Sequence, residues 1–220
     1  DYEVAVAVDA DGYVYSGGSN DDTVRKIAPD GTEVWSFTGH STRVNAVAVD
    51  ADGYVYSGSH DDTVRKIAPD GTEVTSGGWP FTEHSYNVNA VAVDANGYVY
   101  SGGGDGTVRK IAPDGTQVTS GGWPFTGHSS TLRAVAVDAD GYVYSSGNDR
   151  TVRKIAPDGT QVTSGGWPFT GHSTTVRAVA VDGDGNTYSA DTSGIANKID
   201  ANGNEVWSKN YGNALYAIAV

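Results

Sequence analysis

The 220-residue sequence contains no cysteine and no methionine. Without cysteine, the chain has neither disulfides nor thiolate chemistry. Because methionine is missing even at position 1, we expect a processed or trimmed form from which any signal peptide has been removed. Secreted, viral and cytoplasmic origins all stay open.

Positive charge is also scarce, because 14 lysines and arginines face 27 acidic residues and give a formal net charge of -13. Nucleic acids and anionic membranes bind basic surfaces. The composition therefore predicts neither as a partner. No apolar run approaches the length of a membrane span, so we expect a soluble, acidic protein.

What the sequence does contain is a repeat that fills the chain, with successive copies 41, 44, 44 and 44 residues apart. We call them repeats 1 to 5; they begin near Ala5, Ala46, Ala90, Ala134 and Ala178. Repeats 3 and 4 differ at only six of 44 aligned positions, which indicates recent amplification or design. Each copy is too small to bury its own core, so we expect one domain over residues 1–220.

Each repeat has the pattern of four short strands joined by tight turns. Repeat 2 predicts strands at 44–49, 54–57, 63–68 and 72–75, with turns at 50–53 and 69–71. Asp, Gly and Pro favour these turns, and short connections imply antiparallel neighbours. Four-stranded sheets at this period predict an all-β, five-bladed β-propeller of four-stranded antiparallel blades. A parallel β-helix is the alternative, but its coils need no hairpin turns.

A recurring His–Ser–Asp trio carries a resemblance to a known family. Repeat 2 has His40 before the first strand, Ser57 at the end of the second and Asp61 four residues later. These positions resemble WD-repeat propellers, in which the three residues form a buried network within a blade. The same trio recurs in repeats 3 and 4 as His84, Ser101 and Asp105, and as His128, Ser145 and Asp149.

The trio is less complete elsewhere. Repeat 5 keeps His172 and Ser189 but has Ser193 where Asp is expected, and the family's Trp is replaced by Ile67 in repeat 2. The segment V-R-K-I-A-P-D-G-T-E-V-W is also similar to quinoprotein-type propellers. None of their cofactor residues can be identified, so we expect no cofactor.

Two chemical alternatives are open for these polar motifs. A Ser-His-Asp set is typical of hydrolases, but its recurrence in successive repeats favours a structural network, so we predict no catalytic residues and no enzyme. Asp50-Ala51-Asp52-Gly53 resembles the start of a calcium loop, yet the downstream ligands are missing. We therefore expect a hairpin turn there and no metal site.

An insertion, T-S-G-G-W-P-F-T, distinguishes repeats 2, 3 and 4 and presents Trp79, Trp123 and Trp167. These side chains either fill the gaps between neighbouring blades or stack on a ligand such as a sugar. The chain is similar in size and repeat number to tachylectin-type five-bladed lectins, and near-identical blades would give such a lectin several weak sites with strong avidity.

Several differences between the repeats fall at two places, which the meander puts at the same end of the strands, opposite the acidic turns. One place is the residue before the first strand: Asn45, Asn89, Arg133 and Arg177. The other is the loop after the second strand, with His60, Gly104 and Asn148. Many WD-repeat proteins bind partners at this end. The differences predict either a tailored binding surface or drift in tolerant loops.

The chain ends with A-L-Y-A-I-A-V, residues 214–220, which has the pattern of a surplus first strand. We expect a closed monomer, with strand exchange through this segment as the alternative. Three functions remain: a non-catalytic interaction scaffold, a multivalent carbohydrate-binding lectin, and an amplified or engineered propeller with no ligand. The partner is accordingly a protein or a carbohydrate.

Overall fold

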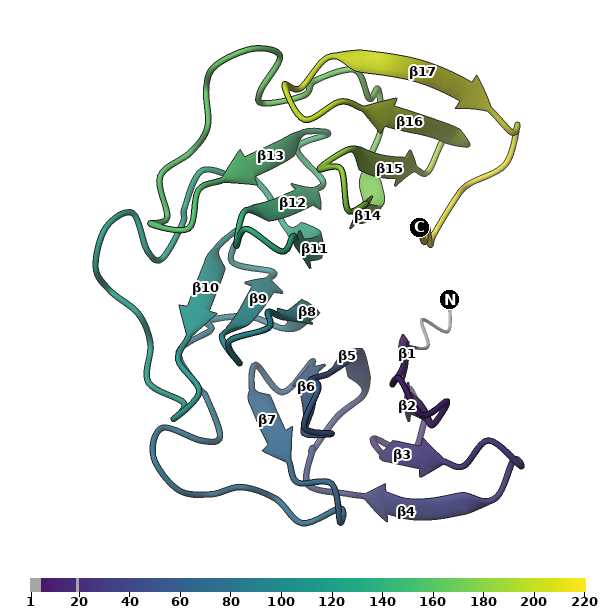
Figure 1. Ribbon diagram of the computed structural model, residues 1–220, viewed down its shortest axis with the longest axis vertical. Coiled ribbons are helices and arrows are strands. Elements are labelled where there is room, and N and C mark those ends of the chain that lie inside the picture. Colours follow the sequence, from purple (N-terminus) through teal and green to yellow (C-terminus); the bar gives the residue numbers. More distant parts are fainter. Residues whose placement is uncertain (1–4, 19) are drawn as a thin grey trace. The chain divides into compact units, whose positions relative to one another are not determined.

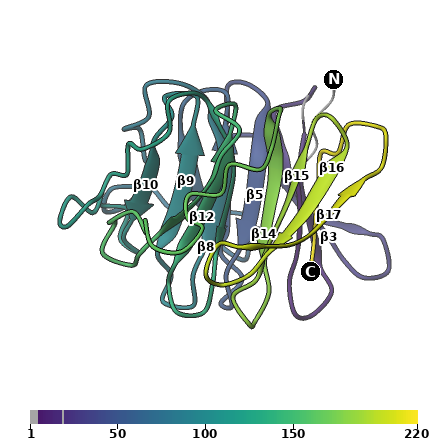
Figure 2. The ribbon, with the colours of Figure 1, turned by 90° about the horizontal axis from the view of Figure 1, so that it is seen from above.

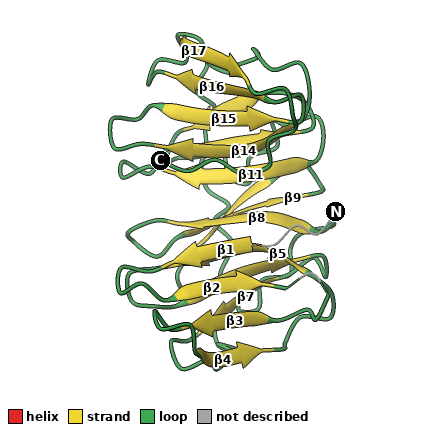
Figure 3. Ribbon diagram, turned by 90° about the vertical axis from the view of Figure 1, so that its right-hand side faces the viewer, coloured by secondary structure: helices red, strands yellow, loops and turns green. Residues whose placement is uncertain are grey.

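The computed structural model describes residues 5–18 and 20–220. All regular structure in this part of the chain is strand, in five antiparallel sheets (Figure 3). No helix there is long and apolar enough to cross a lipid bilayer. The chain divides into two compact units, one of residues 1–103 and 110–117 and the other of 104–109 and 118–220.

Repeats 1 and 5 each form a sheet of four strands in chain order (Figure 1). Repeat 1 contains β1 (Ala5–Val8), β2 (Val14–Gly17), β3 (Val24–Ile27) and β4 (Glu33–Phe37). Repeat 5 contains β14 (Val176–Val181), β15 (Thr187–Asp191), β16 (Ile195–Ile199) and β17 (Glu205–Asn210). Residues 1–4, which include the start of the first predicted strand, lie outside the described part.

Repeats 2, 3 and 4 form sheets of three strands. They are β5 (Val44–Val49), β6 (Val55–Ser59) and β7 (Val64–Ile67); β8 (Val88–Val93), β9 (Val99–Gly103) and β10 (Val108–Ile111); and β11 (Leu132–Val137), β12 (Val143–Gly147) and β13 (Val152–Ile155). The fourth strand predicted at 72–75 is reduced to two isolated bridges, Ile67 to Glu73 and Val64 to Phe81. The Gly-Gly-Trp-Pro insertion separates these bridges, because Gly77 has a φ of 70° and Pro80 has no N–H to donate.

The surplus strand predicted at 214–220 is absent from the structure, which gives these residues no strand. Within the described chain, the segment's backbone hydrogen bond runs from Leu215 N–H to the carbonyl of Asp191 at 3.0 Å. A strand needs a continued row of such bonds.

That residues 1–220 form a single domain stays a prediction.

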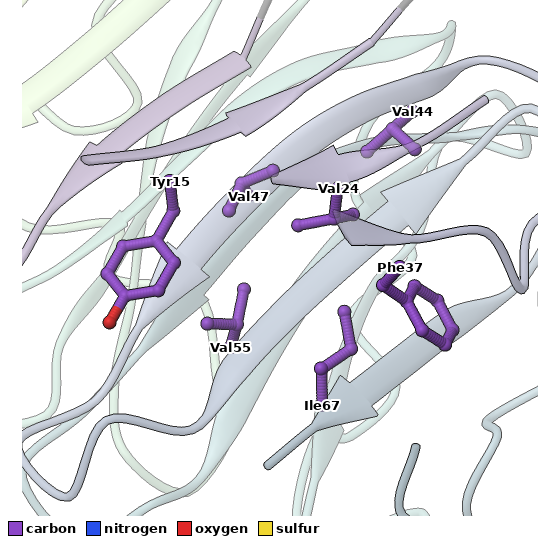
Figure 4. Packing of buried hydrophobic residues seen from close by; sticks show 7 residues of the cluster. All are labelled: Tyr15, Val24, Phe37, Val44, Val47, Val55 and Ile67. Atoms are coloured by element: carbon purple, nitrogen blue, oxygen red, sulfur yellow. The ribbon is translucent and has the colours of Figure 1, made fainter. Parts of the chain in front are cut away.

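The core forms where one face of a sheet packs on the opposite face of the next. Repeat 1 presents an aromatic face to repeat 2, which presents an aliphatic face in return (Figure 4). The aromatic face of repeat 1 consists of Tyr15, Val24, Trp35 and Phe37, and the aliphatic face of repeat 2 consists of Val44, Val47, Val55 and Ile67. Repeats 4 and 5 pack in the same way. Each such buried side chain stabilises the fold by about 1.5–3 kcal/mol.

The antiparallel order places the connections at the two ends of the strands (Figure 2). We call one end the acidic-turn end; in repeat 2 it carries the turns at 50–53 and 68–71. The other is the variable end, which carries the loop at 60–63 and the segment 38–43 that precedes β5. The predicted all-β propeller fold is confirmed by the five repeated antiparallel sheets.

Candidate interaction surface

The acidic-turn end uses its first carboxylate internally. Asp50 accepts the backbone N–H groups of Asp52 at 3.0 Å and Tyr54 at 2.9 Å, and its other oxygen accepts the Tyr56 hydroxyl at 2.9 Å. Burial, and next the charge of Asp50, raise the pKa of Tyr56. The same arrangement recurs at Asp9, Asp94, Asp138 and Asp182. With three donors bound, Asp50 anchors a hairpin turn.

The three inserted tryptophans also belong to this end. Trp79 is 4 % exposed and donates its indole N–H to the carbonyl of Pro113 in the next repeat at 3.2 Å. Gly78 N–H donates to the carbonyl of Asp114 at 2.8 Å. A Cβ at Gly78 would lie 2.3 Å from the carbonyl oxygen of Gly115, which explains the Gly-Gly pair. We call this set of contacts the tryptophan clasp.

The clasp recurs along the chain. Trp123 donates to Pro157 at 3.2 Å, Trp167 to Ala201 at 3.3 Å and, without the insertion, Trp35 to Pro69 at 3.0 Å. Trp123 and Trp167 are as buried as Trp79. Of the two interpretations from sequence, this geometry favours packing between repeats, because no ring face is open for a sugar.

The His–Ser–Asp residues come together beneath the variable end. His40 Nδ1 donates to Asp61 at 2.9 Å, and its Nε2 accepts the Ser57 hydroxyl at 2.8 Å. Burial alone would raise the pKa of Asp61, but hydrogen bonds from His40 and Thr63 hold it well below 3.8. The order of groups is that of a hydrolytic triad. Ser57, however, is 0 % exposed, so no substrate reaches it.

Repeat 4 has the same two bonds, from His128 to Asp149 at 2.9 Å and to Ser145 at 2.8 Å. In repeat 3 the structure gives the bond between His84 and Ser101 at 2.8 Å, while Asp105 accepts the hydroxyl of Thr107 at 2.6 Å. The serines of both repeats are fully buried.

Repeat 5 completes its network with a residue that the sequence alignment missed. His172 bonds Ser189 at 2.7 Å and Asp191 at 2.9 Å, so the acid lies two residues before the position of Ser193. Ser193 donates its N–H and hydroxyl to Asp191, as Thr63 does to Asp61. The recurring pair Asp-x-Thr or Asp-x-Ser is the signal that identifies the acid.

The four residues proposed at the start of the first strands lie where the pairing register with the second strand shifts, and they contact other parts of the protein. They are Asn45, Asn89, Arg133 and Arg177. Asn45 donates to the carbonyl of Val88 at 2.9 Å, and Arg133 donates to Asn148 at 3.0 Å. Arg177 lies over the ring of Tyr216, 5.6 Å from its centre, and Asn89 accepts a hydrogen bond from Asn87. Each is therefore engaged within the fold.

A shallow, widely open cavity of about 450 Å³ lies at the variable end between repeats 1 and 2, lined by Asp22, Ser41, Thr42, Arg43 and His60. The side chains of Asp22, Arg43 and His60 make no hydrogen bond or ion pair among the described residues. Asp22 also has a φ of 56°, which is uncommon outside glycine. We call this the Arg43 cavity.

Sequence comparison singled out His60 but missed Asp22 and Arg43. The signal for Arg43 was present, since the equivalent positions hold Asn87, Thr131 and Thr175. Within the described chain, no group of three or more His, Asp or Glu side chains is placed to hold a metal ion.

The comparisons with known proteins agree with this geometry. No curated protein sequence matches the chain significantly. The family described as "WD domain, G-beta repeat" matches residues 31–67, 79–111 and 115–155, which together cover just over half of the chain. The predicted resemblance to WD-repeat propellers is confirmed, and the chain belongs to the WD40 repeat family.

Proposed function

We propose that this WD40 chain is a non-catalytic interaction scaffold that binds an acidic protein partner through the Arg43 cavity. The near identity of repeats 3 and 4 supports a recently amplified or designed origin. The observation that carries the proposal is that two side chains with nitrogen donors, Arg43 and His60, are exposed beside one cavity. Neither makes a side-chain hydrogen bond or ion pair among the described residues.

Arginines on three of the strands differ from Arg43, whereas the exposed Arg150 likewise makes no side-chain hydrogen bond or ion pair among the described residues. The equivalent arginines on β3, β7 and β10 each form an ion pair: Arg25 with Asp21 and Glu33, Arg65 with Glu73, and Arg109 with Asp105. In a chain with a net charge of -13, acidic groups are available to pair with most arginines. Arg43 is instead exposed, and its five donors suit a carboxylate in a two-point contact.

Asp22 restricts the chemistry of the ligand further, because its carboxylate lines the same cavity and favours a partner that donates a hydrogen bond to it. An acidic peptide supplies both, with side-chain carboxylates for Arg43 and backbone N–H groups for Asp22. The chain's overall negative charge opposes approach beyond about 8–10 Å only weakly at physiological salt, because ions screen it.

A carbohydrate ligand has less support, since Trp79, Trp123 and Trp167 are buried in clasps. It is therefore an outcome of the test rather than a second proposal.

The test selects peptides from a random phage-displayed library against the full chain and measures their affinity by calorimetry. The Arg43→Thr/His60→Asn double variant introduces the residue types found at these positions in repeat 4. The matched control, Asp52→Asn, introduces the residue type that repeat 3 has as Asn96 at the acidic-turn end.

We expect acidic peptides whose affinity falls at least about tenfold in the double variant, or ~1.4 kcal/mol, and stays unchanged in the control. Affinity should also fall with added salt. Equal binding by the double variant would contradict the proposal. Recovery of no peptide, together with glycan-array binding or with no binding at all, would replace it with the lectin or the ligand-free interpretation.

A further inference from the structure

The Arg43 cavity contains one carboxylate and one guanidinium that do not pair with each other. Asp22 belongs to the loop between β2 and β3 of repeat 1, and Arg43 directly precedes β5 of repeat 2. Both side chains line the cavity, yet neither forms an ion pair or a hydrogen bond among the described residues. The cavity therefore presents both charges to a ligand at the same time.

The backbone at Asp22 places its side chain beside the next repeat. Asp22 has a φ of 56°, and the equivalent residues share this left-handed conformation: Asp62 at 67°, Gly106 at 73° and Arg150 at 66°. A Cβ at Gly106 would lie 3.0 Å from the carbonyl oxygen of Ser130, which is equivalent to Thr42. A side chain at this position therefore starts next to the segment that precedes the first strand of the following repeat.

The combination of opposite charges is specific to the boundary between repeats 1 and 2. By sequence alignment, the residues that replace Asp22 and Arg43 at the next three boundaries are Asp62 with Asn87, Gly106 with Thr131, and Arg150 with Thr175. Each of these boundaries carries at most one charged residue at the two positions. The pair is thus a feature of the Arg43 cavity and not of the repeat.

A ligand residue that carries both an ammonium and a carboxylate matches this pair. The first residue of a peptide has an α-ammonium, and an Asp or Glu at that position adds a side-chain carboxylate. Hydrogen bonds between charged groups are roughly twice as strong as those between neutral groups, so an α-ammonium is a better donor to Asp22 than a backbone N–H. One short residue also loses less conformational freedom on binding than a lysine and a separate acidic side chain would.

We propose that the amino terminus of the partner enters the Arg43 cavity and that its first residue is Asp or Glu. The α-ammonium donates to the Asp22 carboxylate, and the side-chain carboxylate accepts from the Arg43 guanidinium in a two-point contact. The chain then recognises the free end of an acidic segment and not an acidic stretch within one. This inference rests on the proposed function, because it assigns the first residue of the peptide bound at the same cavity.

Acetylation of the peptide amino terminus tests the proposal on the unaltered full chain. Peptides are selected from a phage library displayed with free amino termini, and each is then synthesised in a free and an acetylated form for calorimetry. We expect selected peptides that begin with Asp or Glu and bind at least tenfold more weakly when acetylated. Acidic peptides that bind equally in both forms overturn this inference and leave the proposed function standing. Recovery of no acidic peptide overturns both.

Variants of the cavity identify the group that binds the ammonium. Asp22→Asn removes the charge but keeps the shape of the side chain, so it should weaken the free peptide at least tenfold and leave the acetylated peptide unchanged. Asp62→Asn is the matched control, because Asp62 has the same backbone conformation and is not among the residues that line the cavity.

Reversing the charge gives a second readout that a merely structural role of Asp22 would not produce. Asp22→Arg introduces the residue type that repeat 4 has at this position as Arg150, on the same left-handed backbone. It should weaken binding of the free peptide and strengthen binding of the acetylated one. Unchanged affinity for the free peptide in both Asp22 variants overturns the proposal.

Discussion

The two ends of the strands use their charged groups in opposite ways. At the acidic-turn end, the first Asp of each turn is fully bonded; Asp138, for example, accepts two backbone N–H groups and the Tyr144 hydroxyl. At the variable end, Asp22, Arg43 and His60 line a cavity, and their side chains make no hydrogen bond or ion pair among the described residues. We therefore base the proposed binding surface on polar side chains without described partners, and not on the density of charge.

The largest expected effect comes from removing a clasp at the acidic-turn end. Trp167→Ala should destabilise the fold by about 3–5 kcal/mol, because it leaves a cavity between repeats 4 and 5 and removes the indole hydrogen bond to the Ala201 carbonyl. Urea unfolding at low protein concentration measures this. Trp207→Ala is the control, because Trp207 pairs with Lys198 on β16 as Trp35 pairs with Lys26 on β3 but is 40 % exposed. A loss as large as that of Trp167→Ala would refute the distinction between them.

A smaller loss is expected when a turn carboxylate is removed. Asp138→Ala should cost about 1–3 kcal/mol, since the buried Tyr144 hydroxyl loses its acceptor. Asp140→Ala, two residues away in the same turn, should change the unfolding free energy by less than about 0.5 kcal/mol. Adding Tyr144→Phe to Asp138→Ala should recover part of the loss. Equal effects of the two Asp substitutions would contradict the account.

Acid should lower the free energy of unfolding in two steps. The first step comes from a buried histidine and the second from the carboxylates. Burial lowers the pKa of His172 below 6.5, with Asp191 opposing the shift, so the folded state binds its proton less readily than the unfolded state. Stability is then complete above about pH 6.5 and falls as the pH drops toward the folded pKa. Asp61, whose folded pKa is also depressed, adds a loss that begins below its unfolded value near 3.8.

Thermal unfolding from pH 8 to pH 3 measures both steps. His172→Gln should remove the decline that begins below about pH 6.5 and leave the one below pH 3.8 in place. An unchanged profile in this variant would assign the first step to other groups.

The smallest effect concerns backbone strain at the variable end. Arg150 has a φ of 66°, and its equivalent in repeat 3 is Gly106 with a φ of 73°. For residues other than glycine, this left-handed backbone conformation costs roughly 1–2 kcal/mol. Arg150→Gly should therefore stabilise the fold by about 1 kcal/mol, and Gly106→Arg should destabilise it by a similar amount. Calorimetry of both variants checks this, and shifts of the same sign in both would contradict it.

The fold was largely predictable because the repeat fixes the strands and turns five times over. The loss of the fourth strands in repeats 2–4 was not predictable. In the clasp, hydrogen bonds from Gly78 and Trp79 to the next repeat replace hydrogen bonds between strands. This replacement depends on contacts between repeats, which the pattern of residues along one strand does not show. For the same reason, the sequence favoured packing between repeats for Trp79 but left stacking on a ligand open.

The candidate site was less predictable. Asp191 was missed because repeat 5 shifts its acid by two residues while keeping the loop length, so that position-by-position alignment fails. The Arg43 cavity combines Asp22 of repeat 1 with Arg43 of repeat 2. Residues from two repeats become one site only through packing, whereas comparison of repeats considers each copy separately.

We propose that the variable end binds the protein partner and that the contacts elsewhere stabilise the fold. It is tested most directly by measuring unfolding free energy and peptide affinity together for the Arg43→Thr/His60→Asn variant. The account predicts an unfolding free energy within about 0.5 kcal/mol of the parent chain, because both side chains are exposed and unpaired, with loss of acidic-peptide binding. Retained binding, or a loss of stability comparable to that of Asp138→Ala, would contradict it.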